Sequence, residues 1–560
     1  MPRSETSPMH NRHLAHWPTA LPQHLTVPAT NLYYNVEVAA TRFPDKPFLL
    51  FYDTPITFRA FHQQTLNIAG YLQQVCGVKK GDRVLLYLQN SPQFMLAYYG
   101  ILRADAVVVP VNPMNLGAEL QYMVEDTGAR VAFVAQDLLP AIEPLLGHGL
   151  TRLIAVTYAD YLTTPTTQAI PPALAAARMD CNDVAITPWC DMLDAALMPA
   201  QLVSGPDDLC VMPYTSGTTG HPKGCMHTHR SVMYNAVSGA HWFAMQPDTV
   251  VLSVLPLFHV TGMQGTMNGP LYAGCTVVLL PRWDADAAAQ LVERHRVNVL
   301  HLIATMVIDF LANPRIDDYD LRSVQTIRGG GAAMPEAVAQ QLQARLGLAY
   351  IEGYGMSETI APTHLNPPQR AKPQCLGVPI FDVDARVIDP ELLNEVADGE
   401  VGEIIVYGPQ VMQGYWNNPE ANSSTFIEID GKRFLRTGDL GRVDEDGYFF
   451  MVDRLKRMIN SAGFKVWPAE VEAMMYQHPA IHEVCIYGID DARRGQSVTA
   501  AVVLKKTLEE AVTEQAIIDW TRLTMAAYKT PRRIIFMDAL PKSGTGKIQW
   551  RSLQDAFKKM

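Results

Sequence analysis

Residues 209–224 have the sequence LCVMPYTSGTTGHPKG, which is the most informative segment of the chain. The apolar run LCVM predicts a buried strand, and a segment rich in Ser, Thr and Gly follows it directly. Glycine lets backbone N–H groups approach phosphate oxygens, the hydroxyls donate further hydrogen bonds, and Lys223 supplies positive charge. The stretch therefore predicts a polyphosphate-binding loop at the end of a strand. Its spacing does not fit the GxxxxGK[ST] loop, which argues against a P-loop kinase or ATPase.

On both sides of this loop, short apolar runs alternate with segments of helical period. Strands are expected at residues 85–89, 106–111, 131–135, 250–255, 275–280, 298–303 and 349–355, and helices at 91–104, 116–128 and 284–296. Such alternation predicts parallel sheets covered on both faces, with ligands at the carboxyl ends of the strands. Residues 161–206, rich in Thr, Ala and Pro, predict a loosely structured insert. After about residue 400, shorter runs at 403–408, 447–452, 482–488 and 499–504 and a helix at 468–477 predict a small α+β domain with antiparallel strands.

The composition excludes several classes of protein. Of the 560 residues 48% are hydrophobic and 18% charged, and 45 basic against 56 acidic residues give a net charge of −11. That balance argues against a protein that coats nucleic acid, which needs clustered Lys and Arg. Eight scattered cysteines without a CxxC pair predict reduced thiols, not a disulfide framework or zinc site. With no secretion signal and no run of about 18 clean apolar residues, we expect a cytoplasmic protein without a transmembrane segment, leaving peripheral membrane contact and a homodimer open.

Three further motifs carry chemistry. They are GYGMSET (353–359), TGDLGRVDEDGYFFMVDRLKRMINSAGFKVWPAEVE (437–472) and PKSGTGKIQWR (541–551). In the first, a Tyr beside Gly can stack on a purine, a hydroxyl can reach a phosphate, and a carboxylate can hold a hard cation. In the second, a carboxylate can pair with vicinal ribose hydroxyls. In the third, a Gly-rich loop can bring the ammonium group of Lys547 to developing negative charge.

With these motifs in this order, the sequence resembles the adenylate-forming superfamily of acyl-CoA synthetases, adenylation domains and luciferases, from about Asn31 to the end. Residues 453–472 look especially similar to bacterial medium- and long-chain fatty acyl-CoA synthetases. The resemblance implies an α/β fold: a large N-terminal domain (1–452) of layered, mostly parallel sheets with flanking helices and a small β-barrel-like subdomain, then a small mobile α+β C-terminal domain (453–560). It also implies ATP and CoA as substrates, Mg²⁺ as cofactor, and rotation of the C-terminal domain about Asp453 between two half-reactions.

The resemblance also implies roles for individual residues. Lys547, His259, Glu358 and Lys223 would be catalytic, with Glu358 as the Mg²⁺ ligand and His259, in LPLFHVTGM (255–263), beside the reacting carboxylate. The nucleotide- and CoA-binding residues would be Thr215, Ser216, Gly217, Thr218, Thr219, Gly220 and Lys223 for phosphates, Tyr354 for adenine, Ser357 for the α-phosphate, Asp439 and Arg454 for ribose, and Gly463 for the pantetheine arm. Several relatives have Lys where this chain has Asn460, so no role is assigned there.

The resemblance implies a carboxylic acid as the third substrate, and we expect a medium- to long-chain fatty acid. In amino-acid-activating members of the superfamily that the sequence resembles, this neighbourhood supplies an Asp to the α-ammonium group. Leu257, Phe258 and His259 offer no carboxylate here, which argues against an amino acid. Met263, Gln264, Met267, Ile303, Thr305 and Met306 are expected to line an acyl tunnel above the small residues of GGGAAMP (329–335). Aromatic or dicarboxylic acids and a stand-alone amino-acid adenylating enzyme remain alternatives. A non-catalytic binding protein on the same fold is disfavoured, because Lys547, Glu358 and the phosphate loop are all intact.

Overall fold

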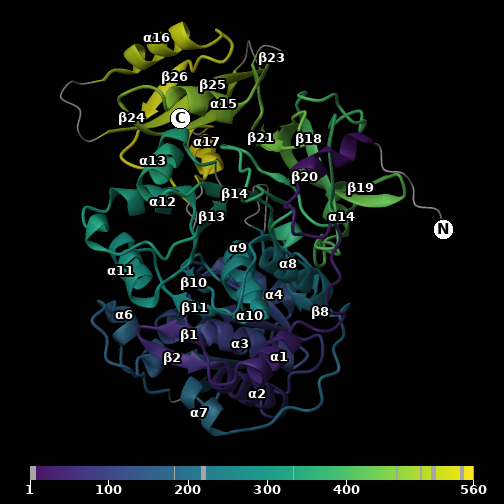
Figure 1. Ribbon diagram of the computed structural model, residues 1–560, viewed down its shortest axis with the longest axis vertical. Coiled ribbons are helices and arrows are strands. Elements are labelled where there is room, and N and C mark those ends of the chain that lie inside the picture. The colour runs from purple at the N-terminus through teal and green to yellow at the C-terminus, as the bar shows by residue number, and fades with distance from the viewer. Residues whose placement is uncertain are drawn as a thin grey trace. The chain divides into compact units, whose positions relative to one another are not determined.

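The structure is a computed structural model, and it describes residues 8–181, 183–215, 222–331, 333–461, 464–491, 495–505, 512–542 and 548–558. Contacts divide the chain into two compact units (Figure 1). Unit 1 comprises Met1–Asp384, Val406–Leu435 and Asp446–Tyr448, and unit 2 comprises Ala385–Ile405, Arg436–Glu445 and Phe449–Met560. The single boundary expected at residue 453 stays a prediction.

The larger sheet of unit 1 has nine strands, of which six consecutive neighbours, β14 to β1, are parallel. Its order is β16 (Val378–Pro379), β15 (His364–Leu365), β14 (Tyr350–Tyr354), β13 (Thr326–Gly330), β12 (Val299–His301), β10 (Val250–Ser253), β11 (Thr276–Leu279), β1 (Pro47–Phe51) and β2 (Thr54–Thr57). The edge strands β15, β16 and β2 are antiparallel. Parallel neighbours end at one edge of a sheet, so the segments after β10, β12, β13 and β14 lie there together.

The second sheet of unit 1 has seven strands, all parallel except β9. Its order is β7 (Ile186–Pro188), β6 (Arg152–Val156), β5 (Val131–Ala135), β3 (Arg83–Tyr87), β4 (Val107–Pro110), β8 (Leu209–Val211) and β9 (His227–Thr228). The strand β8 confirms the strand predicted before the phosphate loop. The strand β7 and helix α7 (Trp189–Asp194) lie in the insert that was predicted to be loosely structured, so this segment contributes an edge strand.

Helix α3 (Pro92–Arg103) is buried along its whole length and fills the space between the two sheets. Ser91 caps it by accepting a hydrogen bond from the Phe94 backbone N–H (3.1 Å), and Pro92 takes the first helical position, where no N–H is needed. One apolar cluster joins α3 to β3 of one sheet and to β1 and β11 of the other, together with α1 (Tyr34–Arg42), α2 (Phe58–Gln74) and α8 (His229–Trp242). Figure 1 shows α1, α2 and α3 together beside β1 and β2.

The outer faces of both sheets are covered as well. In β3, Val84 and Leu86 face α3, whereas Leu85 and Tyr87 pack against α4 (Ala118–Thr127). The outer face of the nine-stranded sheet packs against α11 (Ala285–His295), α12 (Ala304–Ala312) and α13 (Glu336–Leu346). Strands with apolar side chains on both faces must be covered on both, so the predicted layered α/β architecture is confirmed.

Two smaller sheets follow. The first is a half-barrel of β17 (Asp384–Ile388), β18 (Gly402–Tyr407), β20 (Lys432–Val443) and β19 (Phe426–Ile429), with β21 (Phe449–Arg454) paired to β20. The second has the order β23 (Phe464–Val466), β22 (Ile459–Ser461), β25 (Gly495–Leu504) and β24 (Ile481–Asp491), with β26 (Arg533–Phe536) on β25. Here β26 is parallel to β25, whereas the sequence pattern had predicted only antiparallel strands.

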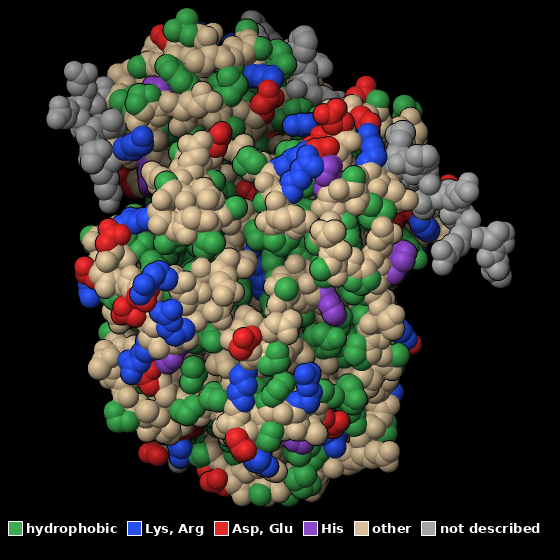
Figure 2. Space-filling model, in the orientation of Figure 1, with side chains coloured by type: hydrophobic (Ala, Val, Ile, Leu, Met, Phe, Trp, Pro, Cys, Tyr) green, Lys and Arg blue, Asp and Glu red, His purple; other side chains and the backbone are tan. Residues whose placement is uncertain are grey.

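The second small sheet also has two covered faces. Val484 and Ile486 of β24 pack against α15 (Pro468–Met475) and α16 (Glu514–Thr524), and the alternate residues Cys485 and Tyr487 pack against α17 (Trp550–Lys558). None of the helices in the described ranges is both long and apolar enough to span a bilayer. On the face seen in Figure 2, basic and acidic side chains are interspersed among wide areas of uncharged surface.

Candidate functional site

The carboxyl edge of the nine-stranded sheet collects several of the predicted residues of unit 1. Strand β14 ends at Tyr354 and leads into a short helix, η7 (Ser357–Thr359), which carries Ser357 and Glu358. The neighbouring β13 ends in glycines because the backbones approach closely: a Cβ on Gly329 would lie 2.0 Å from the Leu302 carbonyl oxygen. This explains the predicted small-residue floor by the packing of neighbouring backbones.

The two ends of the phosphate loop are joined at its base. The Thr215 backbone N–H donates to the Lys223 carbonyl (2.9 Å), and Tyr214 and Gly224 form an antiparallel bridge. The adjoining chain is held by a second segment, since the Trp416 N–H donates to the Gly224 carbonyl (2.8 Å). This hairpin-like base fixes where the loop leaves and re-enters the fold. Ser216, Gly217, Thr218, Thr219 and Gly220 lie outside the described residues.

Tyr415 connects two of the predicted catalytic side chains. Its hydroxyl donates a 2.7 Å hydrogen bond to Glu358 Oε1, and Lys223 Nζ lies 4.8 Å from the centroid of its ring. Burial, together with the neighbouring Glu358 carboxylate, raises the pKa of Tyr415 well above its ordinary value. The phenol therefore stays a donor at neutral pH. The result is a Lys223–Tyr415–Glu358 cluster in which a cation, a ring and a carboxylate are held together.

Ser357 is positioned by a buried histidine. His227 Nε2 lies 2.7 Å from the Ser357 carbonyl oxygen, and burial lowers the pKa of His227 to about 4. The ring is therefore neutral and donates through Nε2. The turn that follows has left-handed backbone at Ile360 (φ 46°) and Ala361 (φ 35°), an unfavourable conformation for a β-branched residue. Asn235 Nδ2 stabilises this turn by donating to the Thr359 and Ile360 carbonyls (3.1 Å each).

His259 lies at the start of helix α9 (Val260–Met263). Its Nδ1 accepts a hydrogen bond from the Thr261 backbone N–H (3.3 Å), which orients the ring as a helix cap. Gly262 makes this turn possible, because a Cβ there would lie 2.3 Å from the Pro256 carbonyl oxygen. The helix continues into a π-helical turn, η5 (Gln264–Asn268), a rare geometry that is frequent at functional sites. Of the expected tunnel residues, Met263 and Met267 are fully buried and Thr305 is exposed.

A buried carboxylate supports the loop after β13. Glu352 precedes the GYG motif on β14, and its Oε1 accepts from the Met334 backbone N–H (2.9 Å). Burial raises the pKa of Glu352 to about 7. The side chain thus connects the strand that bears Tyr354 to the loop 331–335. Tyr354 itself makes an edge-to-face contact with His364, with ring centroids 5.6 Å apart.

Unit 2 contains Asp439 and Arg454, which are predicted to bind the ribose, and Asp453, the predicted hinge residue. Asp439 and Arg454 are register partners on β20 and β21, and Arg454 Nε lies 3.0 Å from Asp439 Oδ1. The Asp439 side chain is 2% exposed and that of Arg454 is 47% exposed, so the arginine covers the carboxylate. The next residue, Asp453, accepts hydrogen bonds from the Arg454 and Ala469 backbone N–H groups (2.6 and 2.7 Å). It thereby ties the end of β21 to the start of α15. Gly463 and Lys547 lie outside the described residues.

Sequence reasoning missed Tyr415, His227 and Glu352. Each is far from its partner in the chain, for example 57 residues from Tyr415 to Glu358 and 130 from His227 to Ser357. A lone buried histidine or tyrosine carries no spacing signal. Only Glu352 had a usable sign, because it is a charged residue in an otherwise apolar predicted strand.

Comparisons with known proteins agree along most of the chain. A family model described as AMP-binding enzyme matches residues 36–416, and one described as AMP-binding enzyme C-terminal domain matches residues 470–547. A long-chain-fatty-acid–CoA ligase of Bacillus subtilis (strain 168) is 35% identical over 550 residues, covering 96% of this chain and 97% of that protein. A 4-coumarate-CoA ligase 1 of Narcissus pseudonarcissus is 30% identical over 525 residues, with 92% and 91% covered. A solved fatty acyl CoA synthetase of Mycobacterium tuberculosis superimposes with a TM-score of 0.71 at 28% identity, covering 94% of this chain and 98% of that one.

Proposed function

The chain belongs to the AMP-binding enzyme family, and we propose that it ligates a medium- to long-chain fatty acid to coenzyme A through an acyl-adenylate, releasing AMP and pyrophosphate. The observation that carries the proposal is the Lys223–Tyr415–Glu358 cluster at the base of the phosphate loop. The cluster brings a cation and a carboxylate to the base of the loop that would bind the phosphates of a nucleoside triphosphate. The fatty-acid substrate is supported by the Bacillus subtilis relative, which aligns with nearly the whole chain.

Within this proposal, each residue binds, orients or offsets charge. The loop 215–223 binds the β- and γ-phosphates of ATP, with Lys223 offsetting the charge of the departing pyrophosphate. Tyr354 stacks on adenine, Ser357 contacts the α-phosphate, and Asp439 with Arg454 binds the ribose. His259 and Lys547 orient the fatty-acid carboxylate for attack on the α-phosphate. The carboxylate oxygen forms the new bond to phosphorus as the bond to pyrophosphate breaks.

Magnesium fits the donor set. The described residues contain no cluster of three or more His, Cys, Asp or Glu side chains that could cage a metal. Mg²⁺ is commonly held by one or two carboxylates together with substrate phosphates, and Glu358 supplies such an oxygen. Tyr415 orients that carboxylate. When bound, Mg²⁺ would offset charge on the phosphates of ATP.

The second half-reaction is thioester formation. The CoA thiol attacks the acyl carbonyl, forming the thioester bond while AMP leaves. The proposal includes a C-terminal domain (453–560) that rotates about Asp453, which withdraws Lys547 and presents Gly463 to the pantetheine arm. It also includes a cytoplasmic location, with a homodimer and peripheral membrane contact left open.

Aromatic acids are the second candidate substrates. The Narcissus relative is named for 4-coumarate and aligns over 92% of this chain. The deciding measurement is CoA-dependent AMP release with straight-chain acids from about C4 to about C18. The affinity for these acids should rise with chain length, because each buried CH₂ contributes about 0.8 kcal/mol. Benzoate, 4-coumarate and adipate complete the panel. Turnover of the aromatic acids without turnover of any straight-chain acid would reject the fatty-acid proposal.

The role of Lys547 is tested by Lys547→Ala. Acyl-AMP formation should fall strongly while thioester formation from added acyl-AMP and CoA continues, because the lysine acts only in adenylation. Lys542→Ala is the matched control, since Lys542 lies in the same segment but pairs with Glu483. Acyl-AMP formation at the wild-type rate in Lys547→Ala would show that the assignment is wrong.

A further inference from the structure

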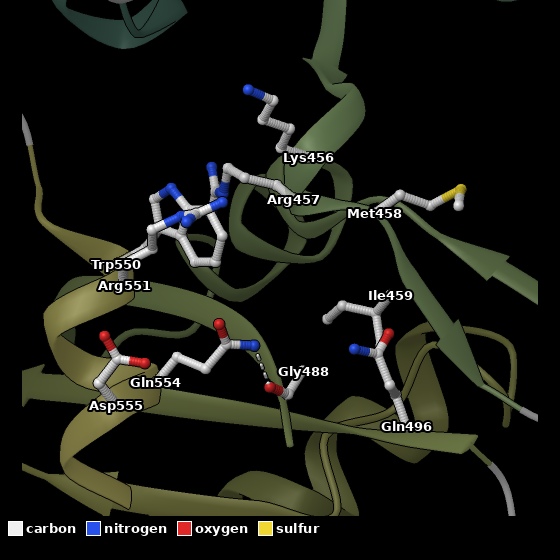
Figure 3. A pocket seen from close by; sticks show the side chains of 10 residues that line it. All are labelled: Lys456, Arg457, Met458, Ile459, Gly488, Gln496, Trp550, Arg551, Gln554 and Asp555. Carbon is white, nitrogen blue, oxygen red and sulfur yellow. Dashed lines mark hydrogen bonds between the residues drawn. The ribbon is translucent and has the colours of Figure 1, made fainter. Parts of the chain in front are cut away.

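Unit 2 contains a pocket that the proposed reaction does not use. It has a volume of about 330 Å³ and lies between the segment 456–459, the sheet strands β24 and β25, and helix α17 (Figure 3). Its walls are formed by Lys456, Arg457, Met458, Ile459, Gly488, Gln496, Trp550, Arg551, Gln554 and Asp555. The volume is at the low end of the range for small-molecule sites and exceeds that of a bare ion.

Two arginines in this pocket have buried nitrogen atoms without a partner. Among the residues that the structure describes, neither Arg457 Nε nor Arg551 Nε makes a hydrogen bond. A buried unsatisfied N–H group is costly and is rare in native structures. In Figure 3 the side chain of Arg457 extends toward the end of the pocket at which Trp550 and Arg551 lie. Both arginines line the same cavity.

The two guanidinium groups differ in how their charge is balanced. Arg457 pairs with Glu472 and lies 3.9 Å from Asp453, so its charge is compensated by neighbours. Arg551 has no ion pair within the described part of the chain, and its guanidinium carbon lies 4.9 Å from the Trp550 ring centroid. This contact is a cation–π interaction, and it uses none of the arginine's N–H groups as hydrogen-bond donors. Arg551 thus contributes an uncompensated positive charge to the pocket.

The remaining polar groups favour an acceptor-rich ligand. Gln496 Oε1 accepts from the Asn460 N–H (2.9 Å), which leaves its amide N–H groups for a ligand. Gln554 uses its amide on the Gly488 carbonyl (2.7 Å). Lys456 is the third cationic residue of the wall, and Asp555, which is exposed on α17, is its one acidic residue. A wall with several donors and more positive than negative charge suits an anion with several oxygens.

We propose that this pocket binds the phosphate group of a small phosphorylated ligand, with Arg551, Arg457 and Gln496 as its donors. The proposed function supplies three sources of that chemistry: pyrophosphate, a nucleotide and the 3′-phosphate of CoA. The wall residues Lys456 and Arg457 lie in η8 (Leu455–Arg457), which begins two residues after Asp453. A ligand in the pocket would therefore contact η8, the segment directly after the proposed hinge residue Asp453.

Direct binding tests the proposal without turnover. The full chain, prepared free of phosphate and sulfate and saturated with AMP, is titrated calorimetrically with inorganic phosphate, pyrophosphate, CoA and 3′-dephospho-CoA. At least one phosphate ligand should bind, and more weakly at about 200 mM than at about 50 mM salt, because the attraction is screened. Preference for CoA over 3′-dephospho-CoA identifies the 3′-phosphate as the source, and preference for pyrophosphate identifies the reaction product.

Arg551→Gln should weaken this binding at least about tenfold, since hydrogen bonds to charged groups are strong. Gln496→Leu should weaken it without a change of charge, and it serves as the second test if Arg551→Gln fails to fold. Arg522→Gln is the control, because Arg522 lies on α16 outside the pocket wall and pairs with Asp519. Wild-type affinity in both pocket variants, or no binding of any of these ligands by the wild-type chain, would overturn the proposal. Failure of the ligase assay alone would leave it standing.

Discussion

Replacing Tyr415 with phenylalanine tests how the candidate site holds its carboxylate. The change removes the 2.7 Å hydrogen bond to Glu358 and keeps the ring beneath Lys223. A hydrogen bond to a charged group contributes about 1.5–3 kcal/mol. At about 1.4 kcal/mol per factor of ten, a carboxylate that acts in adenylation should lose roughly 10- to 100-fold in kcat/KM. Because Glu358 is the proposed Mg²⁺ ligand, the Mg²⁺ concentration for half-maximal rate should also rise.

The assay is acyl-AMP formation in the absence of CoA, measured as a function of Mg²⁺ concentration. Tyr87→Phe is the matched control: Tyr87 lies on β3 of the seven-stranded sheet and its hydroxyl donates to the Asn115 carbonyl (2.6 Å), so the variant loses a hydrogen bond but none to Glu358. Tyr415→Leu additionally removes the ring from Lys223 and should lower activity further. An equal loss in Tyr87→Phe and Tyr415→Phe, or an unchanged Mg²⁺ dependence in Tyr415→Phe, would show that the Tyr415 hydroxyl does not hold a Mg²⁺-binding carboxylate.

Three further changes test other parts of unit 1. Burial raises the pKa of Glu352 to about 7, so its protonated side chain contributes stability that is present below about pH 4.5 and is lost as the pH rises through 7. The free energy of unfolding in urea should therefore fall by up to about 3 kcal/mol over this range, and Glu352→Gln should remove the fall. Burial lowers the pKa of His227 to about 4, so the free energy of unfolding should fall by up to about 3 kcal/mol as the pH is lowered from about 6.5 to 4. His227→Gln should remove this pH dependence. Gly262→Ala puts a Cβ 2.3 Å from the Pro256 carbonyl oxygen, so the adenylation rate should drop at least about tenfold and the thermal midpoint of unfolding should fall. Gly239→Ala on α8 is the control and should be tolerated, because no atom lies within 4 Å of the added Cβ.

The repeating part of the fold could be predicted because its signals are local. The strand at residues 131–135 and helix α3 behind Ser91–Pro92 follow directly from apolar runs and capping residues. The strands β1 and β2 were missed, since PFLLF is too short to distinguish a strand from a buried helix segment. Strand β7 was missed because a three-residue edge strand in a Pro-rich segment has almost no pattern.

The candidate site could be predicted only where its residues share a motif. Glu358, Ser357 and Lys223 lie in compact motifs whose chemistry can be interpreted from the residue types. The side chains that orient them, Tyr415 and His227, come from distant segments that meet only in the folded chain. Each of them contributes a hydrogen bond between segments that are distant in the chain, and no local sequence pattern predicts such a bond. The contact between Asp439 and Arg454 follows from the register of β20 and β21, which places the two residues opposite each other.

The place of β1 in the nine-stranded sheet has a consequence for synthesis of the chain. This strand pairs with β11, and the Thr276 hydroxyl donates to the Pro47 carbonyl across 229 residues of sequence. At about 5–20 residues per second, a ribosome needs about 10–45 s to make the partner that β1 requires. Throughout that interval the nascent chain presents an apolar strand with one unpaired edge, which is a template for wrong association. Production of this protein should therefore depend on chaperones and on slow, cool expression, and fragments that end before residue 276 should aggregate.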